Sequence, residues 1–117
     1  LIVEDSPTMR QLISFALKRI RGVRIVEAGD GVDGLKKVSA EKFDMIFTDI
    51  NMPVMNGFQL CEKLVELDAN IKVCFLSGGE MNQEAIREIY PRISLGCFIK
   101  KPVGANELIE RVNSQLE

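Results

Sequence analysis

The sequence contains no histidine. Histidine is the most frequent general base in enzymes, and it activates serine or cysteine in many nucleophilic sites. Its absence therefore excludes Ser-His and Cys-His catalytic pairs. Any chemistry in this chain must use carboxylates, hydroxyls and lysines.

Cysteines are few and far apart. Cys61, Cys74 and Cys97 form no CxxC pair, and there is no histidine to complete a zinc site. Free cysteines of this kind usually behave as small hydrophobic residues, and unpaired thiols are typical of a reducing compartment. We therefore expect three separate core residues in a cytoplasmic protein.

The chain also lacks a long apolar segment and a strong net charge. No apolar stretch approaches the roughly 20 residues that a membrane span needs, and no signal-peptide pattern is present. The net charge of -2 gives no electrostatic reason to bind nucleic acid or an anionic membrane. Because the chain opens on Leu-Ile-Val without an initiator methionine, we expect that the first residues of the first strand are missing.

The composition is that of an ordinary globular domain. Of 117 residues, 46% are hydrophobic and 27% are charged, which is enough apolar material for a buried core. We expect a single domain over residues 1–117.

Five short apolar runs alternate with amphipathic segments. The runs are rich in β-branched and aromatic residues and predict strands at 1–3, 23–28, 43–48, 71–77 and 97–100. The near-continuous apolar character of the central runs is typical of a parallel sheet covered on both faces. We therefore predict an α/β fold of the flavodoxin-like (βα)5 type, with strand order 2-1-3-4-5 and helices on both faces.

The segments between the strands carry apolar residues at helical spacing. Ser6 or Asp5 can cap the first helix with Pro7 at its first position, an Asn56-Gly57 turn opens the third, and Pro91 stops the fourth. The residues expected to face the core are, helix by helix, Met9, Leu12, Ile13, Ala16, Leu17 and Ile20; Val32, Leu35 and Val38; Leu60, Cys61, Leu64 and Val65; Met81, Ala85, Ile86 and Ile89; and Leu108, Ile109, Val112 and Leu116.

Polar side chains gather where the predicted strands end. Glu4 and Asp5 follow the first strand, Asp49 the third, Ser77 closes the fourth and Lys101 follows the fifth. Ligands of open α/β sheets bind at the carboxyl ends of the strands, and the first and third strands are neighbours in the predicted order. We therefore expect the three carboxylates in one crevice, flanked by the serine and the lysine, although each residue alone has an ordinary structural explanation.

Carboxylates that meet in a crevice repel one another. Two unit charges about 4 Å apart cost roughly 4 kcal/mol at an effective dielectric near 20. Either one carboxylate keeps a proton, or a cation lies among them, and Mg²⁺ commonly takes one or two carboxylates while retaining water. The set predicts a magnesium-assisted phosphoryl site in which a carboxylate is the acceptor.

The sequence resembles the receiver domain of two-component response regulators, the CheY-like superfamily, over essentially all of its length. The resemblance rests on IVEDS near the start, TDINMPVMNG at 48–57, LSG at 76–78 and KKP at 100–102. Each motif is weak alone, but together and in this order they are highly specific.

The resemblance implies a role for each residue of the acidic cluster. Asp49 would be the phosphoacceptor. Glu4 and Asp5 would hold Mg²⁺ together with Asp49, and the backbone carbonyl of Asn51 would complete the metal site. The cofactor implied is therefore Mg²⁺.

The resemblance also implies roles around the cluster. Ser77 and Lys101 would bind the phosphoryl oxygens, and the bond before Pro102 tends to be cis in this family. Phe98 would be the aromatic whose rotamer reports activation, although a tyrosine often stands there. Gly79 carries no side chain where some relatives have an acid or an asparagine, which should alter the lifetime of the phosphoryl group.

A phosphorylation-activated signalling switch is the function that the resemblance implies. A histidine kinase would donate the phosphoryl group from its phosphohistidine, and a shift of the face at residues 81–117 would control a downstream effector protein or fused output domain. The same face could form a homodimer. The protein would catalyse its own phosphoryl transfer and dephosphorylation without being a turnover enzyme.

Other functions fit the sequence less well. A haloacid-dehalogenase-type phosphatase would want its nucleophile after the first strand with a second aspartate two residues on, whereas Asp49 follows the third strand and position 51 is asparagine. A Rossmann-type nucleotide binder would show GxGxxG after the first strand. A degenerate receiver, which would act as a phosphorylation-independent interaction module, remains the main alternative.

Overall fold

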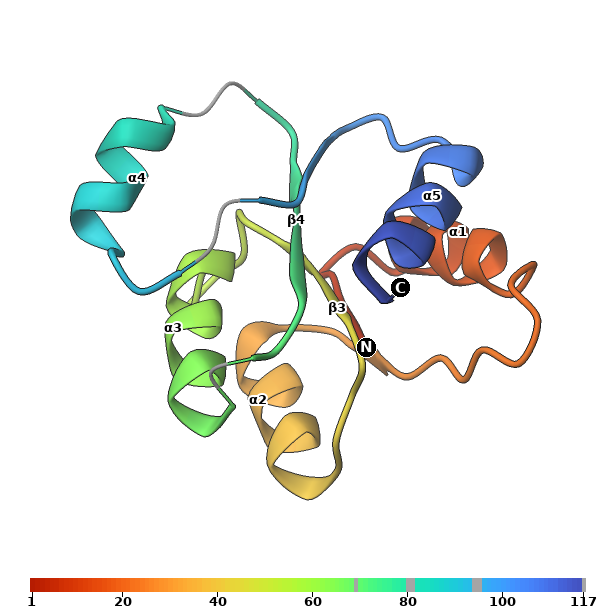
Figure 1. Cartoon of the computed structure of the whole chain (residues 1–117), viewed down its shortest axis with the longest axis horizontal. Coiled ribbons are helices and arrows are strands. Elements are labelled where there is room, and N and C mark those ends of the chain that lie inside the picture. The colour runs from red at the N-terminus through yellow and green to blue at the C-terminus, as the bar shows by residue number, and fades with distance from the viewer. Residues whose placement is uncertain (69, 80–81, 94–95, 117) are drawn as a thin grey trace.

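The computed structural model describes residues 1–68, 70–79, 82–93 and 96–116, in which five strands and five helices alternate along the chain (Figure 1). The elements are β1 (Ile2–Val3), α1 (Pro7–Leu17), β2 (Glu27–Ala28), α2 (Gly31–Ala40), β3 (Ile46–Asp49), α3 (Gly57–Leu67), β4 (Val73–Ser77), α4 (Gln83–Ile89), β5 (Phe98–Lys100) and α5 (Ala105–Leu116). None of the helices in these described ranges is long and apolar enough to cross a membrane.

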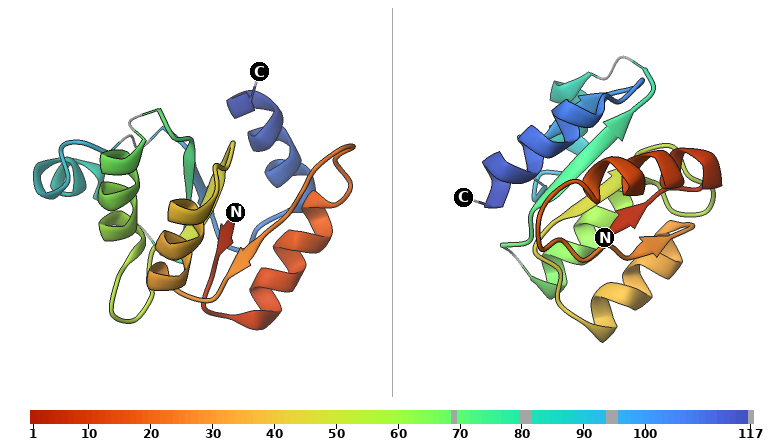
Figure 2. Two further views of the ribbon diagram at one scale, coloured as in Figure 1. Left: turned by 90° about the horizontal axis from the view of Figure 1, so that it is seen from below. Right: turned by 90° about the vertical axis from the view of Figure 1, so that its right-hand side faces the viewer.

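The strands form one parallel sheet in the order β2-β1-β3-β4-β5. Helices α1 and α5 cover one face, and α2, α3 and α4 cover the other (Figures 1 and 2). This arrangement confirms the predicted flavodoxin-like fold and its strand order. It also makes β1 the direct neighbour of β3, which is the pairing that the site requires.

Alternate residues of the central strands supply the two halves of the core. Phe47 and Leu76 pack towards α1 and α5, whereas Ile46 and Phe75 pack into clusters with residues of α3. Successive side chains of a strand point to opposite faces, so a strand covered on both sides is apolar at most successive positions. The uninterrupted apolar runs of the sequence reflect this requirement.

The predicted helix starts are confirmed. The Ser6 hydroxyl accepts a hydrogen bond from the backbone N–H of Met9, and Pro7 is the first residue of α1. The Asn56 side chain accepts from the backbone N–H of Gln59, whose own side chain accepts from the Asn56 N–H. Such reciprocal capping satisfies two helix donors that would otherwise lack partners.

Strand boundaries differ from the prediction. The second strand was expected over 23–28 but covers Glu27–Ala28 alone, and the third was expected over 43–48 but covers Ile46–Asp49. The second strand pairs only with β1, which itself has two residues. The Val26 carbonyl still accepts from the Ile2 N–H over 2.9 Å, but β1 is too short to pair with the residues before it, and Val23 is exposed.

Several predicted core positions on the helices are wrong. Leu12 of α1 is 60% exposed, Ile89 of α4 is 67% exposed, and Val32 and Leu116 are also exposed. Ala85 of α4 is exposed as well. Each helix touches the sheet along a narrow line, so apolar residues at the margin of its stripe stay in solvent. The predicted core residue Met81 lies outside the described residues.

All three cysteines are buried in the core, as expected, but the prediction that they are unpaired is wrong for two of them. Cys74 and Cys97 form a disulfide with a Cα–Cα distance of 4.6 Å, while Cys61 is a buried free thiol. The two bonded residues directly precede the register pair Phe75–Phe98 of β4 and β5, so they lie side by side on neighbouring strands. Their separation of 23 residues in the sequence concealed this contact.

Candidate functional site

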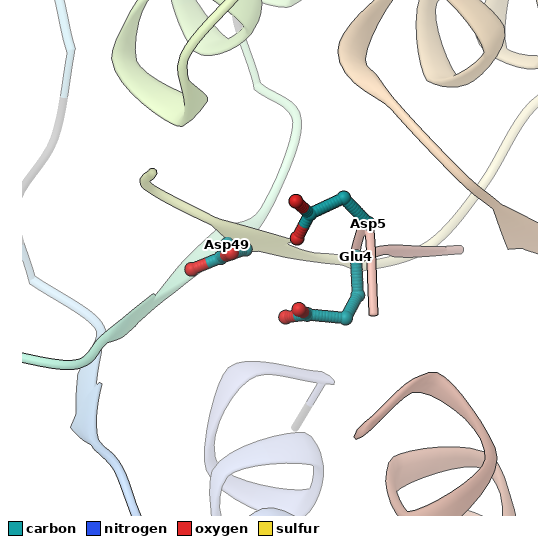
Figure 3. Close-up of side chains that lie close together, drawn as sticks. All are labelled: Glu4, Asp5 and Asp49. Atoms are coloured by element: carbon teal, nitrogen blue, oxygen red, sulfur yellow. The ribbon is translucent and has the colours of Figure 1, made fainter. Parts of the chain in front are cut away.

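The acidic residues meet at the carboxyl edge of the sheet. Val3 of β1 is in register with Thr48 of β3, so Glu4 and Asp5 leave β1 beside Asp49, the last residue of β3. Carboxylate oxygens of all three lie within 4.8 Å of one another (Figure 3). Glu4 and Asp49 are buried, and Asp5 is exposed at the rim.

Lys101 faces two of these carboxylates. Its Nζ lies 3.3 Å from Oε2 of Glu4 and 3.2 Å from Oδ1 of Asp49, and its side chain is 21% exposed. Its neighbour Lys100 is exposed. The Lys101–Pro102 peptide bond is cis. The end of β5 thus places an ammonium group against the buried acids.

Burial and neighbouring charges both shift the pKa values of Glu4 and Lys101 in this cluster. Burial raises the pKa of Glu4, the neighbouring Asp49 carboxylate raises it further, and the Lys101 ammonium opposes both. Burial would lower the pKa of Lys101, but its hydrogen bond and charge interaction with Asp49, together with the Glu4 charge, raise it. Lys101 therefore stays charged, while the cluster keeps more negative than positive charge.

The donor set suits a hard divalent cation. The cluster is the one group of three potential metal ligands among the described residues, and all three ligand atoms are carboxylate oxygens. Mg²⁺ prefers such oxygens and retains water where a site is partly open, as it is beside exposed Asp5. Asn51 is exposed and lies two residues beyond Asp49. The residues present therefore fit Mg²⁺.

A tight loop holds the end of β3 in place. The Thr48 hydroxyl donates to the Asp49 carbonyl over 3.0 Å, and the Gly57 N–H donates to the Ile50 carbonyl over 2.9 Å. Between them Met52 is buried, and Val54 adopts a left-handed φ of 69° that β-branched residues rarely take. The chain therefore turns back within a few residues and starts α3 directly against Asp49.

Ser77 closes β4 at the same edge of the sheet. Its hydroxyl donates to the Gly79 carbonyl over 2.7 Å and accepts from the Gly79 N–H over 3.3 Å. Among the described residues, the hydroxyl bonds to this loop and not to Asp49. Ser77 is thus near the cluster but engaged by its own loop.

Phe98 of β5 belongs to an aromatic cluster on the α3 and α4 side. Its ring centroid lies 5.3 Å from that of Phe75 and 6.5 Å from that of Phe58. Phe58 also stacks on Tyr90, which follows α4, at 5.5 Å. Phe98 is only partly buried.

Two features of the site have no signal in the sequence motifs. A Cβ added to Gly57 would lie 2.4 Å from the carbonyl oxygen of Asp49, so α3 can approach β3 only because this residue is glycine. Arg10 of α1 donates to the backbone carbonyl of Glu4 over 2.8 Å. The sequence motifs predict only a turn at Asn56-Gly57 and assign no role to Arg10.

Comparisons with known proteins agree on one family. The sequence model described as the response regulator receiver domain matches residues 1–113. The chemotaxis protein CheY of Treponema pallidum is 32% identical over 120 residues, covering all of this chain and 81% of that protein. The sensor protein EvgS of Escherichia coli K12 is 39% identical over 98 residues, which are 84% of this chain and only 8% of that protein.

Solved structures show the same fold. A CheY-like response regulator receiver domain protein from Methanospirillum hungatei has a TM-score of 0.86 at 25% identity, covering 98% of this chain and 90% of that one. The chemotaxis protein CheY4 of Vibrio cholerae also has a TM-score of 0.86, at 24% identity, covering 98% and 95%. Because the identity with CheY4 is only 24%, this similarity supports the fold alone.

Gly57→Ala tests the close contact that holds Asp49. The added methyl would collide with the Asp49 oxygen and lie 3.0 Å from the Ile50 Cα, and both obstacles are backbone atoms that no rotamer change can move. We expect the free energy of unfolding to fall by about 1–3 kcal/mol in urea titrations. Gly104→Ala is the matched control because a Cβ there meets nothing within 4 Å. Equal stabilities of the two variants would contradict this role of Gly57.

Proposed function

The chain belongs to the response regulator receiver domain family, and from that premise we propose that it is a phosphorylation-activated switch whose phosphoacceptor is Asp49. The position of Asp49 carries the proposal. It is a buried carboxylate at the end of β3, clustered with Glu4 and Asp5 and paired with Lys101. Strong electrostatic interactions between a buried carboxylate and neighbouring charged side chains are typical of functional sites.

The phosphoryl donor is a phosphohistidine on a partner protein. The chain has no histidine of its own, so this group must come from a second protein or another domain, and a histidine kinase is the class that supplies it. An Asp49 carboxylate oxygen attacks the phosphorus, the new O–P bond forms, and the P–N bond breaks. Its electron pair returns to the imidazole, which takes up a proton from solvent.

The side chains around Asp49 prepare the site for this transfer. Glu4, Asp5 and Asp49 would hold Mg²⁺ with the backbone carbonyl of Asn51, and the bound ion supplies neutralisation of negative charge on the pocket and the phosphoryl group. Lys101 already lies within hydrogen-bond distance of Asp49, so it reaches any group attached there. Phosphoryl transfer needs little beyond such positioning and charge stabilisation.

The response begins with the new acceptor oxygens. They compete with the Gly79 carbonyl for the Ser77 hydroxyl, which draws the loop after β4 towards Asp49. The partly buried ring of Phe98 then moves into the space that the loop vacates. Because Ile86 is the only buried residue of α4, this helix can follow at small cost.

The face formed by α4, β5 and α5 carries the signal onward. A change in the position of α4 alters this surface, which contacts a downstream effector protein, a fused output domain or a second copy of the chain. Such a switch is a shift in population, and moving it from 1:99 to 99:1 needs about 5.5 kcal/mol of differential interaction. A smaller coupling would give graded signalling.

The phosphoryl group leaves by hydrolysis within the same site. The protein accordingly catalyses its own phosphorylation and dephosphorylation and is not a turnover enzyme that releases a product from a separate substrate. Gly79 is exposed and presents no side chain near Ser77, which leaves room for water beside the phosphoryl group.

Asp49→Asn tests the acceptor. The amide cannot act as the nucleophile, so incubation with acetyl phosphate or phosphoramidate and Mg²⁺ should add one phosphoryl group to the wild type and none to the variant, as measured by intact mass spectrometry. Asp44→Asn, at an exposed aspartate before β3, is the matched control and should label like the wild type. Labelling of Asp49→Asn would contradict the assignment, and an unlabelled wild type would favour a phosphorylation-independent module.

Lys101→Ala tests the charge opposite the acceptor. Loss of the ammonium removes the group that stabilises the transferring oxygens, and removal of one such donor typically slows a reaction by about 10²–10³-fold. We therefore expect Lys101→Ala to be labelled about 10²–10³-fold more slowly than the wild type in a time course at a fixed concentration of acetyl phosphate. Lys100→Ala removes an exposed lysine from the adjacent position and should leave the rate unchanged. Equal slowing in both variants would indicate a general charge effect instead.

A further inference from the structure

Arg10 ties together three elements beside the acidic cluster. Its Nη1 donates to the backbone carbonyl of Glu4 over 2.8 Å, and its Nε lies 3.3 Å from Oε1 of Glu27. The arginine side chain is only 23% exposed. One guanidinium therefore links α1 to the end of β1 and to β2.

The contact fixes the peptide from which Asp5 departs. The carbonyl of Glu4 belongs to the planar unit that joins Glu4 to Asp5, so a bond to its oxygen sets the orientation of that plane. The N–H of Glu4 is held as well, since it donates to the Ala28 carbonyl over 3.1 Å. Asp5 itself is exposed, and among the described residues no hydrogen bond or ion pair holds its side chain.

We propose that Arg10 is a positioning residue that orients the Glu4–Asp5 pair for binding of Mg²⁺. The inference rests on the proposed function, since it presumes that this pair binds the cation. Arg10 contacts the backbone between the two acids and not their carboxylates, so it acts on the metal through them. Residues that orient metal ligands in this way typically change metal affinity by about 10–100-fold when they are replaced.

Charge alone predicts the opposite result. Arg10 is a cation close to a site that binds a cation, so its removal would strengthen Mg²⁺ binding if only the Coulomb interaction mattered. Its salt bridge with Glu27 already offsets much of that repulsion. Weaker binding after loss of the arginine would therefore identify positioning as the dominant effect.

The geometry also requires arginine in particular. Two different nitrogens of the guanidinium serve the Glu4 carbonyl and the Glu27 carboxylate. A lysine ammonium is a compact charge on a flexible stem and does not reproduce this fork. Arg10→Lys keeps the charge and should still lose part of the affinity.

The experiment is a calorimetric titration of Mg²⁺ into the wild type, Arg10→Met, Arg10→Lys and Glu27→Gln. We expect the Kd to rise about tenfold in Arg10→Met and by less in the other two. The double variant Arg10→Met with Glu27→Gln should bind no more weakly than Arg10→Met alone, because both changes break the same link. Arg19→Met removes an exposed arginine that follows the same helix and is the matched control.

Thermal melting without metal separates positioning from general destabilisation. A structural role alone would lower the melting temperature of Arg10→Met and leave its Kd for Mg²⁺ unchanged, which would overturn the inference. Tighter binding in Arg10→Met would overturn it too. If Arg10→Met does not fold, Arg10→Lys decides by the same criterion, because it leaves the charge unchanged. Failure of the wild type to bind Mg²⁺ would contradict the proposed function first, and this inference with it.

Discussion

Repulsion among the carboxylates of Glu4, Asp5 and Asp49 is the constraint on which the rest of the structure depends. The sheet order makes β1 and β3 neighbours, which forces the three acids to within 4.8 Å of one another at one edge. Lys101 balances only part of this charge, and burial raises the pKa of Glu4. The proposed binding of a cation and a phosphoryl group would offset this repulsion.

The two sides of this cluster differ in how firmly they are held. Gly57 lets α3 pack directly against the end of β3, and Arg10 fixes the peptide after Glu4, so the backbone that carries the acids has little freedom. By contrast, Ile86 is the only buried residue of α4, and within the described part of the chain the Ser77 hydroxyl bonds only to Gly79. Segments with few buried contacts move at small free-energy cost, and signalling elements are drawn from them.

Local chemistry and the order of elements made much of this structure predictable. Ser6 and Asn56 predicted the helix starts, and the strand-end positions of Asp49 and Lys101 placed both at one edge before any coordinates were known. What the sequence concealed depends on exact packing. Helical spacing does not show which apolar residues lie at the margin of the buried stripe, so Leu12 and Ile89 were predicted to be buried but are exposed. The contact between Cys74 and Cys97 depends on the register of two strands, which the sequence does not show. The contact of Arg10 with Glu4 depends on how α1 crosses the sheet.

The most direct test of the central claim is the melting temperature of the wild type as a function of Mg²⁺ concentration. If the acids need a cation, the free energy of unfolding should rise with the logarithm of the free Mg²⁺ concentration once this exceeds the Kd of the site. The rise should be about 2.7 kcal/mol at 100 times that Kd. NaCl at matched ionic strength should give a much smaller rise, because screening alone cannot replace a bound ion. A melting temperature that responds equally to both salts, or to neither, would contradict the account.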